Sequence, residues 1–191
     1  MLTEQLEQPL PKPRRDLVGY ASARVLEALL EGILALEFLK RGYTRNAAGK
    51  AFQAWRALTG ALLALERDKL VESLRSEEQR RWLEKAIPRV PSSRLKPLSQ
   101  LLERAGIPYY SSLTDKALSL HDYQYHGPDP DLELSKYRGR GEAVYDILVL
   151  LAELARVTEE RVKPRLQEAS RWTRDHEEAL QRLQERLATS R

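Results

Sequence analysis

Two long segments with helical periodicity, separated by a very short connection, constrain the fold of this chain more than any other feature. The first begins at Asp16, a good N-cap, and runs to about Arg41. Gly42 follows and can adopt the left-handed backbone conformation that ends a helix. Thr44 is the expected cap of the second, which continues to about residue 65 with one continuous apolar face. Because the connection is so short, the second helix must fold back antiparallel, and the sequence predicts a long helical hairpin.

The rest of the chain also has helical periodicity, and no stretch alternates as a half-buried strand does. A strongly apolar helix over residues 143–154 is long enough to be the central strut of the core. Further helix starts are indicated by capping residues or by a proline in the first turn: Ser76 with Gln79, Ser92 or Ser93, Ser112 with Asp115, and Pro164. The predicted fold class is therefore all-α, an up-and-down helical bundle built on the hairpin.

Three regions are expected: a polar tail over 1–15, the bundle over 16–158 and a charged C-terminal helix over 159–191. In that last helix, apolar residues between 166 and 187 recur at alternating spacings of three and four, as in a heptad seam weakened by Thr173 and His176. Such a seam is typical of a coiled coil or dimer arm. The alternative is a helix that packs this stripe onto its own bundle.

Composition excludes several classes of function. The chain has no cysteine, so disulfides, thiolate metal sites and cysteine nucleophiles are absent. The first 15 residues are polar, and no apolar run approaches the ~20 residues of a membrane span, so we expect a soluble cytoplasmic protein with no membrane contact. A net charge of +4 permits a nucleic-acid partner without requiring one, and 31% charged residues equally suit the ion-paired surface of a thermophile protein.

Residues 120–127 bring together more reactive side chains than any other stretch, at a helix end just before the loop Pro128-Asp129-Pro130-Asp131. His121 and His126 lie five residues apart, about 140° around a regular helix, so they are poorly placed to share one metal ion. Phosphate-binding glycine fingerprints are missing as well. We therefore expect no metal and no cofactor, and any chemistry here is metal-free proton transfer.

Metal-free cleavage of RNA needs a base, an acid and a cation for the phosphate, and this region offers all three. The candidates are His126 or His121 for proton transfer with Asp122 or a tyrosine to orient it, Arg138 and Arg140 for phosphate, and Tyr123 and Tyr125 for base stacking. The structural alternative is half-buried tyrosines that close the bundle, histidines bonded to nearby carbonyls and solvated arginines.

A second candidate site is the start of the second helix, where Arg45 and Asn46 are followed by Lys50. A helix N-terminus has unpaired amides and a positive dipole, so it can hold a phosphate or a carboxylate. The alternative is a structural role, in which Glu27 and Glu31 of the first helix form ion pairs with Arg45 or Lys50 across the hairpin.

Residues 41–55 (RGYTRNAAGKAFQAW), with ASARVLEA at 21–28, resemble the signature of the archaeal PaREP-type family over about residues 20–157. That family is similar to the wider HEPN group of nucleotide-binding helical domains, which includes ribonuclease toxins and helical partners of nucleotidyltransferases. The resemblance implies a helical bundle that binds RNA or a nucleotide and is often paired as a homodimer. It also implies an alternative, a non-catalytic module that docks on a protein such as a nucleotidyltransferase.

The ribonuclease motif of HEPN domains is an arginine, usually a polar residue next, and a histidine a few positions later. His126 matches the histidine and Asp122 the polar residue, whereas His121 stands where the arginine should be. An imidazole is only partly charged at neutral pH and cannot grip phosphate through two parallel donors. The resemblance therefore favours a binding domain, or a degenerate metal-independent ribonuclease, over an active enzyme.

Overall fold

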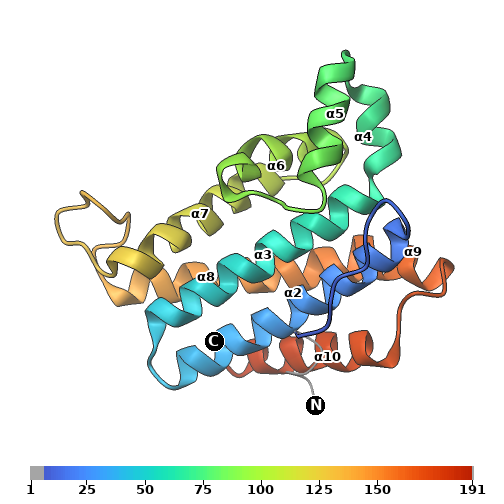
Figure 1. Ribbon diagram of the computed structural model, residues 1–191. Helices are drawn as coiled ribbons and strands as arrows, with labels where there is room; N and C mark the ends of the chain where they lie inside the picture. The colour runs from blue at the N-terminus through green and yellow to red at the C-terminus, as the bar shows by residue number, and fades with distance from the viewer. Residues whose placement is uncertain (1–6, 191) are drawn as a thin grey trace.

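The antiparallel hairpin predicted from the sequence is the axis of the structure, a computed structural model that describes residues 7–190 (Figure 1). Over those residues the chain is all-α, as expected, and contains no strand. The helices are α2 (Leu17–Lys40), α3 (Thr44–Leu65), α4 (Arg67–Ser73), α5 (Glu77–Ala86), α6 (Leu95–Arg104), α7 (Tyr110–His126), α8 (Arg140–Val157), α9 (Lys163–Glu168) and α10 (Arg174–Ala188). No helix among them is both long and apolar enough to cross a membrane.

The ends of the two hairpin helices match the predicted capping residues only in part. Asp16 caps α2 by accepting a hydrogen bond from the Gly19 amide at 2.7 Å, and Gly42 has the left-handed φ of 84° that ends the helix. The prediction that Thr44 caps α3 is wrong. Tyr43 occupies the N-cap position and makes no side-chain capping bond, while Thr44 is the first helical residue and its hydroxyl is buried.

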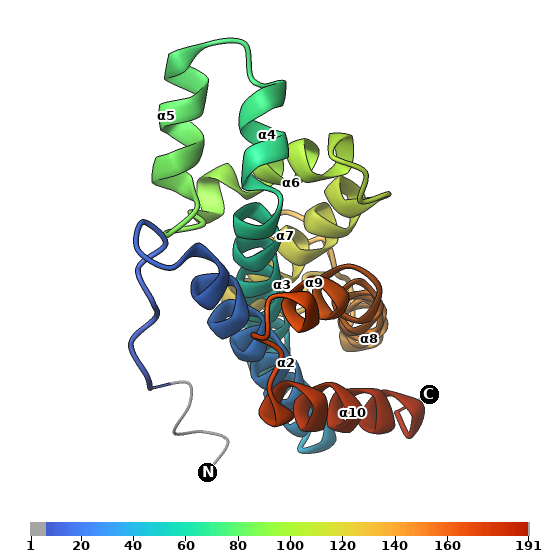
Figure 2. The ribbon, with the colours of Figure 1, turned by 90° about the vertical axis from the view of Figure 1, so that its right-hand side faces the viewer.

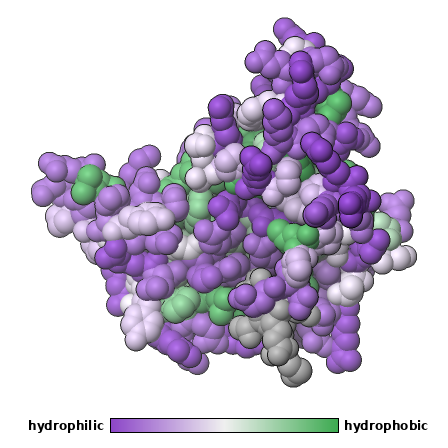
Figure 3. Space-filling view, in the orientation of Figure 1, coloured by the Kyte–Doolittle hydropathy of each residue, from purple (hydrophilic) through white to green (hydrophobic). Residues whose placement is uncertain are grey.

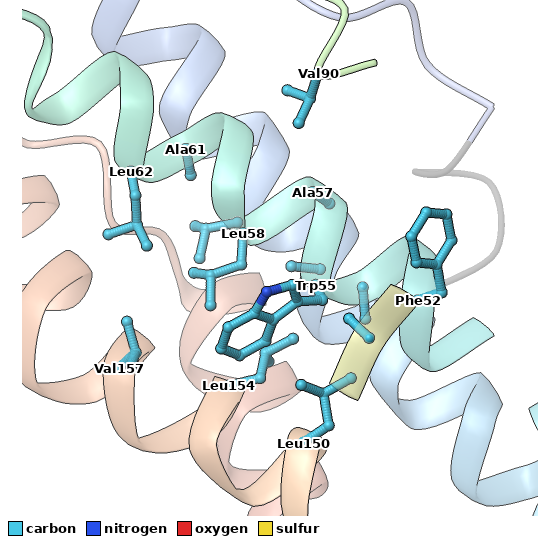
Figure 4. Close-up of a cluster of buried hydrophobic side chains, with 14 of the residues drawn as sticks. Phe52, Trp55, Ala57, Leu58, Ala61, Leu62, Val90, Leu150, Leu154 and Val157 are labelled. Atoms are coloured by element: carbon cyan, nitrogen blue, oxygen red, sulfur yellow. The ribbon is translucent and has the colours of Figure 1, made fainter. Parts of the chain in front are cut away.

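Helix α3 is the central helix of the bundle and packs against α2, α7 and α8. Trp55 is fully buried on it, stacks on Tyr110 at 4.6 Å between ring centroids and donates from Nε1 to the Thr114 hydroxyl at 2.9 Å. Figure 4 shows the indole beside Leu150 and Leu154 of α8. The apolar helix predicted over 143–154 therefore lies in the core, as one wall around α3.

Helices α4 and α5 stand out from one end of the bundle as a short antiparallel pair (Figures 1 and 2). The predicted capping box is confirmed: Ser76 accepts from the Gln79 amide at 3.2 Å, and the Gln79 side chain accepts from the Ser76 amide. The separate helix α4 was not predicted. After α5 the chain crosses back through Val90, whose side chain is fully buried, into a 3-10 turn (Ser92–Arg94) and α6.

Helix α7 begins two residues earlier than its predicted cap. Tyr109, with a left-handed φ of 60°, holds the N-cap position in place of Ser112. Glu103 of α6 accepts from the Ser111 amide at 2.7 Å, so a carboxylate of the preceding helix satisfies one amide of the first turn. The helix ends at His126, where Gly127 has a φ of 74°.

The C-terminal part is not the single helix predicted from Pro164 to about residue 188. Helix α8 continues through a π-helical turn (Thr158–Val162) into α9, and Pro164 lies in the first turn of α9 where its missing amide donor is tolerated. The break comes later, at Ser170, which has a φ of 55°. Thr173 then caps α10, so the apolar residues before and after it do not form one heptad seam.

Helix α10 packs its apolar stripe onto α2 and α8, the alternative to a free dimer arm (Figure 2). His176 contributes to this packing: its side chain is only 2% exposed and lies tilted against Trp172, with 5.0 Å between the ring centroids. Its Nδ1 accepts from the Thr173 amide at 3.2 Å, and its Nε2 therefore carries the proton donated to the Ser22 carbonyl at 2.9 Å. The first of these bonds requires the neutral ring, since a protonated Nδ1 cannot accept.

We therefore predict that lowering the pH destabilises the fold through the packing of α10. Burial, opposed by the Ser22 carbonyl and by nearby Asp175, lowers the pKa of His176 below its ordinary value of 6.5. As the pH falls below about 6.5 the unfolded chain takes up a proton that the folded chain refuses, so stability is lost by up to about 1.4 kcal/mol per pH unit. Urea unfolding at several pH values should show this slope in the native chain and a smaller slope in His176→Gln; parallel curves would contradict the assignment.

Candidate functional site

His121 and His126, the two histidines of residues 120–127, lie in the last turns of α7. His121 belongs to the interface with α3. The His121 ring stacks on Phe52 with 4.1 Å between centroids and meets Tyr125 edge-on at 5.2 Å. Its Nδ1 atom is buried and has no hydrogen-bond partner within residues 7–190. His121 is thus held as an aromatic packing residue rather than as an open phosphate ligand.

The second histidine is in a different environment. His126 is the last residue of α7 and is exposed, and its ring makes no hydrogen bond or ion pair with any described residue. Asp122 is exposed as well, and within the same part of the chain it bonds neither imidazole. The structure does not join the three predicted catalytic side chains into a hydrogen-bonded unit.

Arg45 connects the two sites that the sequence suggested separately. Although it belongs to the first turn of α3, its Nε atom donates to the Gln124 carbonyl at 3.0 Å and its Nη2 atom donates to the Tyr125 carbonyl. These carbonyls are among the unpaired acceptors of the α7 C-terminus, whose partial negative charge favours a cation. One arginine therefore fixes the start of α3 against the end of α7.

A second arginine approaches from the start of α8. The Arg140 guanidinium lies 3.6 Å from the position that a Cβ atom on Gly42 would take, beside the hairpin turn and the uncapped start of α3. Arg138 is exposed two residues earlier, and its backbone amide donates to Glu142 at 2.7 Å. Cationic side chains and free helix amides thus gather at one end of the bundle, where an anion is favoured.

The tyrosines at this end of the bundle differ in how far their rings are exposed. Tyr123 is 1% exposed, meets Tyr137 edge-on at 5.5 Å and has a pKa raised chiefly by burial, so it cannot stack on a ligand. Tyr125 is 60% exposed. Tyr43, at the hairpin turn, is 58% exposed and was missed because an aromatic residue in a turn carries no sequence signal by itself.

We name these neighbouring residues the α7-end surface: Tyr43, Arg45, Tyr125, His126 and Arg140. Next to it an open groove of about 530 Å³ runs between α2, α3 and α7. Gln124 enters this groove with a buried Oε1 atom that has no partner among the described residues. Gly49 makes this packing feasible, since a Cβ atom there would lie 2.6 Å from Cδ of Gln124.

The groove also contains the second predicted site. Lys50 pairs with Glu31 across the hairpin at 2.8 Å, which confirms one of the expected structural ion pairs. Glu27 instead pairs with Arg24 on its own helix at 2.6 Å. Within residues 7–190 no group of three or more His, Asp or Glu side chains is arranged to hold a metal ion. The groups exposed at this end are arginines, helix amides, aromatic faces and the His126 imidazole, which bonds no described residue.

A protein-family model matches most of the bundle. It is the model of the archaeal PaREP1/PaREP8 family, and it matches residues 23–148, about two thirds of the chain, from the second turn of α2 into α8. The matched range includes the whole α7-end surface. No curated protein and no solved structure matches the chain.

Proposed function

The chain belongs to the archaeal PaREP1/PaREP8 family, and we propose that it is a HEPN-like domain that binds RNA or a nucleotide through the α7-end surface. The observation that carries this proposal is the pair of hydrogen bonds from Arg45 of α3 to backbone carbonyls at the end of α7. It brings the uncapped start of α3, the exposed Tyr125 ring and the free His126 imidazole into one neighbourhood. Exposed aromatic faces flanked by cations are what single-stranded nucleic acid requires of a protein.

Binding is favoured over catalysis because of His121. A general acid or base must be held within hydrogen-bond reach of the proton it moves, and a neighbouring cation must stabilise the phosphate. His121, at the motif's arginine position, is stacked on Phe52 and offers no guanidinium. His126 is exposed without an orienting partner among the described residues.

We therefore predict that the purified protein binds a single-stranded oligoribonucleotide in excess EDTA without cutting it. A labelled oligomer should shift in a binding assay and migrate at full length afterwards on a denaturing gel. Cleavage products with cyclic-phosphate ends that disappear in His126→Ala would show instead that the site is catalytic. Absence of any shift at low salt would overturn the proposed function itself.

A second function, dimerisation or docking on another protein, is favoured by one observation. The loop between α7 and α8 carries two exposed leucines, Leu132 at 42% and Leu134 at 65%, and α8 adds Tyr145 at 68%. Leu132 and Tyr145 line one open hollow, and Figure 3 shows a hydrophobic spot on the loop that projects from this end. If these residues form a homodimer contact, light scattering should give a dimer mass that falls to a monomer in Leu134→Glu.

A further inference from the structure

The largest groove described lies at the opposite end of the hairpin, between the segment before α2 and the bases of α4 and α5. Its volume is about 1040 Å³. Six basic side chains line it and only one carboxylate, Glu84; the basic residues are Lys12, Arg14, Arg15, Arg67, Lys85 and Arg89. We call this the basic groove.

The charge of the basic groove is mostly unneutralised. Glu84 is already paired with Arg67 at 2.6 Å, and Arg67 also contacts Asp68 at 2.8 Å. The side chains of the other five basic residues make no hydrogen bond or ion pair with any residue between 7 and 190. Five like charges in one groove repel one another, and that repulsion is relieved when an anion binds.

The basic groove also accounts for the net positive charge of the whole chain. Its lining residues sum to a formal charge of +5, which exceeds the net +4 of the entire sequence. The remainder of the protein is therefore acidic on balance, so the basic character is a local feature and not a property of the surface in general. A local positive field of this kind steers polyanions to one place.

We propose that the basic groove binds the phosphate backbone of nucleic acid without reading its bases. Arginine forks match phosphate oxygens, and three of the five unpaired cations are arginines, Arg14, Arg15 and Arg89. The apolar part of its lining consists of Leu17, Ile87 and two prolines and includes no aromatic residue, so the groove lacks the Trp and Tyr anchors that dominate protein–protein interfaces. Aromatic base platforms are missing from its lining for the same reason.

This groove is distinct from the α7-end surface, since no residue lines both. The five unpaired basic residues come from two segments about 70 residues apart in sequence, 12–15 and 85–89, which meet because α5 folds back beside the start of α2 (Figure 2). The proposal therefore stands or falls independently of the proposed function. If both hold, the groove adds electrostatic affinity for a strand whose bases are engaged elsewhere.

The test uses the full chain and a fluorescent oligouridylate, with affinity measured over a series of salt concentrations. Arg14→Glu/Arg15→Glu should weaken binding at least tenfold at low salt and should reduce the salt slope by about 1.4, the value for two lost phosphate contacts. Both arginines are exposed and precede α2, so the fold should be unaffected. The matched control is Arg174→Glu/Arg182→Glu, an equal change of charge at exposed positions of α10, which should alter both quantities little.

A competitor completes the test. Single-stranded DNA of equal length should displace the oligouridylate from the basic groove as well as RNA does, because only phosphates are contacted. Equal losses in the two charge-reversed variants, or failure of the DNA to displace the oligouridylate, would overturn the proposal. Repeating the measurement in an Arg138→Ala/Arg140→Ala background separates the two sites, since those changes leave the basic groove intact.

Discussion

Replacing Trp55 with alanine is expected to lower the free energy of unfolding by about 3–5 kcal/mol, the largest effect of any single change proposed for this chain. The indole is fully buried at the centre of the bundle, between Tyr110 and the leucines of α8 (Figure 4). Its removal leaves a cavity that α3 cannot close without moving against several helices. It also removes the donor that bonds the Thr114 hydroxyl.

Urea unfolding followed by far-ultraviolet circular dichroism measures this effect without relying on tryptophan emission. Trp82→Ala is the matched control, because Trp82 is only half-buried on α5, and its loss should cost clearly less. Trp55→Phe should fall between the two, since it retains a stacking ring and loses the Nε1 donor. A Trp55→Ala variant within about 1 kcal/mol of the native chain would contradict the central role of α3 in the core.

Replacing Tyr125 with alanine is expected to weaken the binding of single-stranded RNA by roughly 5- to 150-fold, the cost of losing one base–aromatic stack. Tyr125 is one of the two exposed tyrosines of the α7-end surface, and Arg45 bonds the backbone carbonyl of this residue. Its side chain is 60% exposed, so the substitution should cost little stability. Tyr125→Phe should keep most of the affinity, because stacking uses the face of the ring and not the hydroxyl.

A matched control lies at the other end of the same helix. Tyr109 is 74% exposed at the N-cap of α7, with a left-handed φ of 60°, and Tyr109→Asn removes its ring while suiting that backbone conformation. This variant should bind RNA as the native chain does. If the Tyr125 and Tyr109 variants bind equally well, stacking at the α7-end surface is not part of recognition.

Local signals predicted most of the fold. Asp16, Gly42 and the Ser76 capping box act through bonds that span a few residues, and the structure confirms each of them. The errors come where tertiary contacts override local chemistry. Ser112 is displaced as the start of α7 by Glu103 from the preceding helix, and the helix that has Pro164 in its first turn ends at Glu168, before the break at Ser170, instead of near residue 188.

The site was harder to predict, because its decisive contacts join residues far apart in sequence. Arg45 and Tyr125 were each singled out, but nothing in the sequence indicates that one bonds the carbonyl of the other across 80 residues. The burial of Tyr123 and the stacking of His121 likewise depend on the register between α3 and α7. The basic groove was not anticipated at all, since its arginines are dispersed until the chain folds.

Hydrogen–deuterium exchange of the full chain, with and without a saturating oligoribonucleotide, tests the central claim most directly. The account predicts slower exchange at the start of α3, over the last turn of α7 and at the start of α8, where the α7-end surface lies. Protection over 12–17 and 84–89 would report the basic groove separately, and α10 should be unchanged. RNA binding without protection at the start of α3 and the end of α7 would contradict the account.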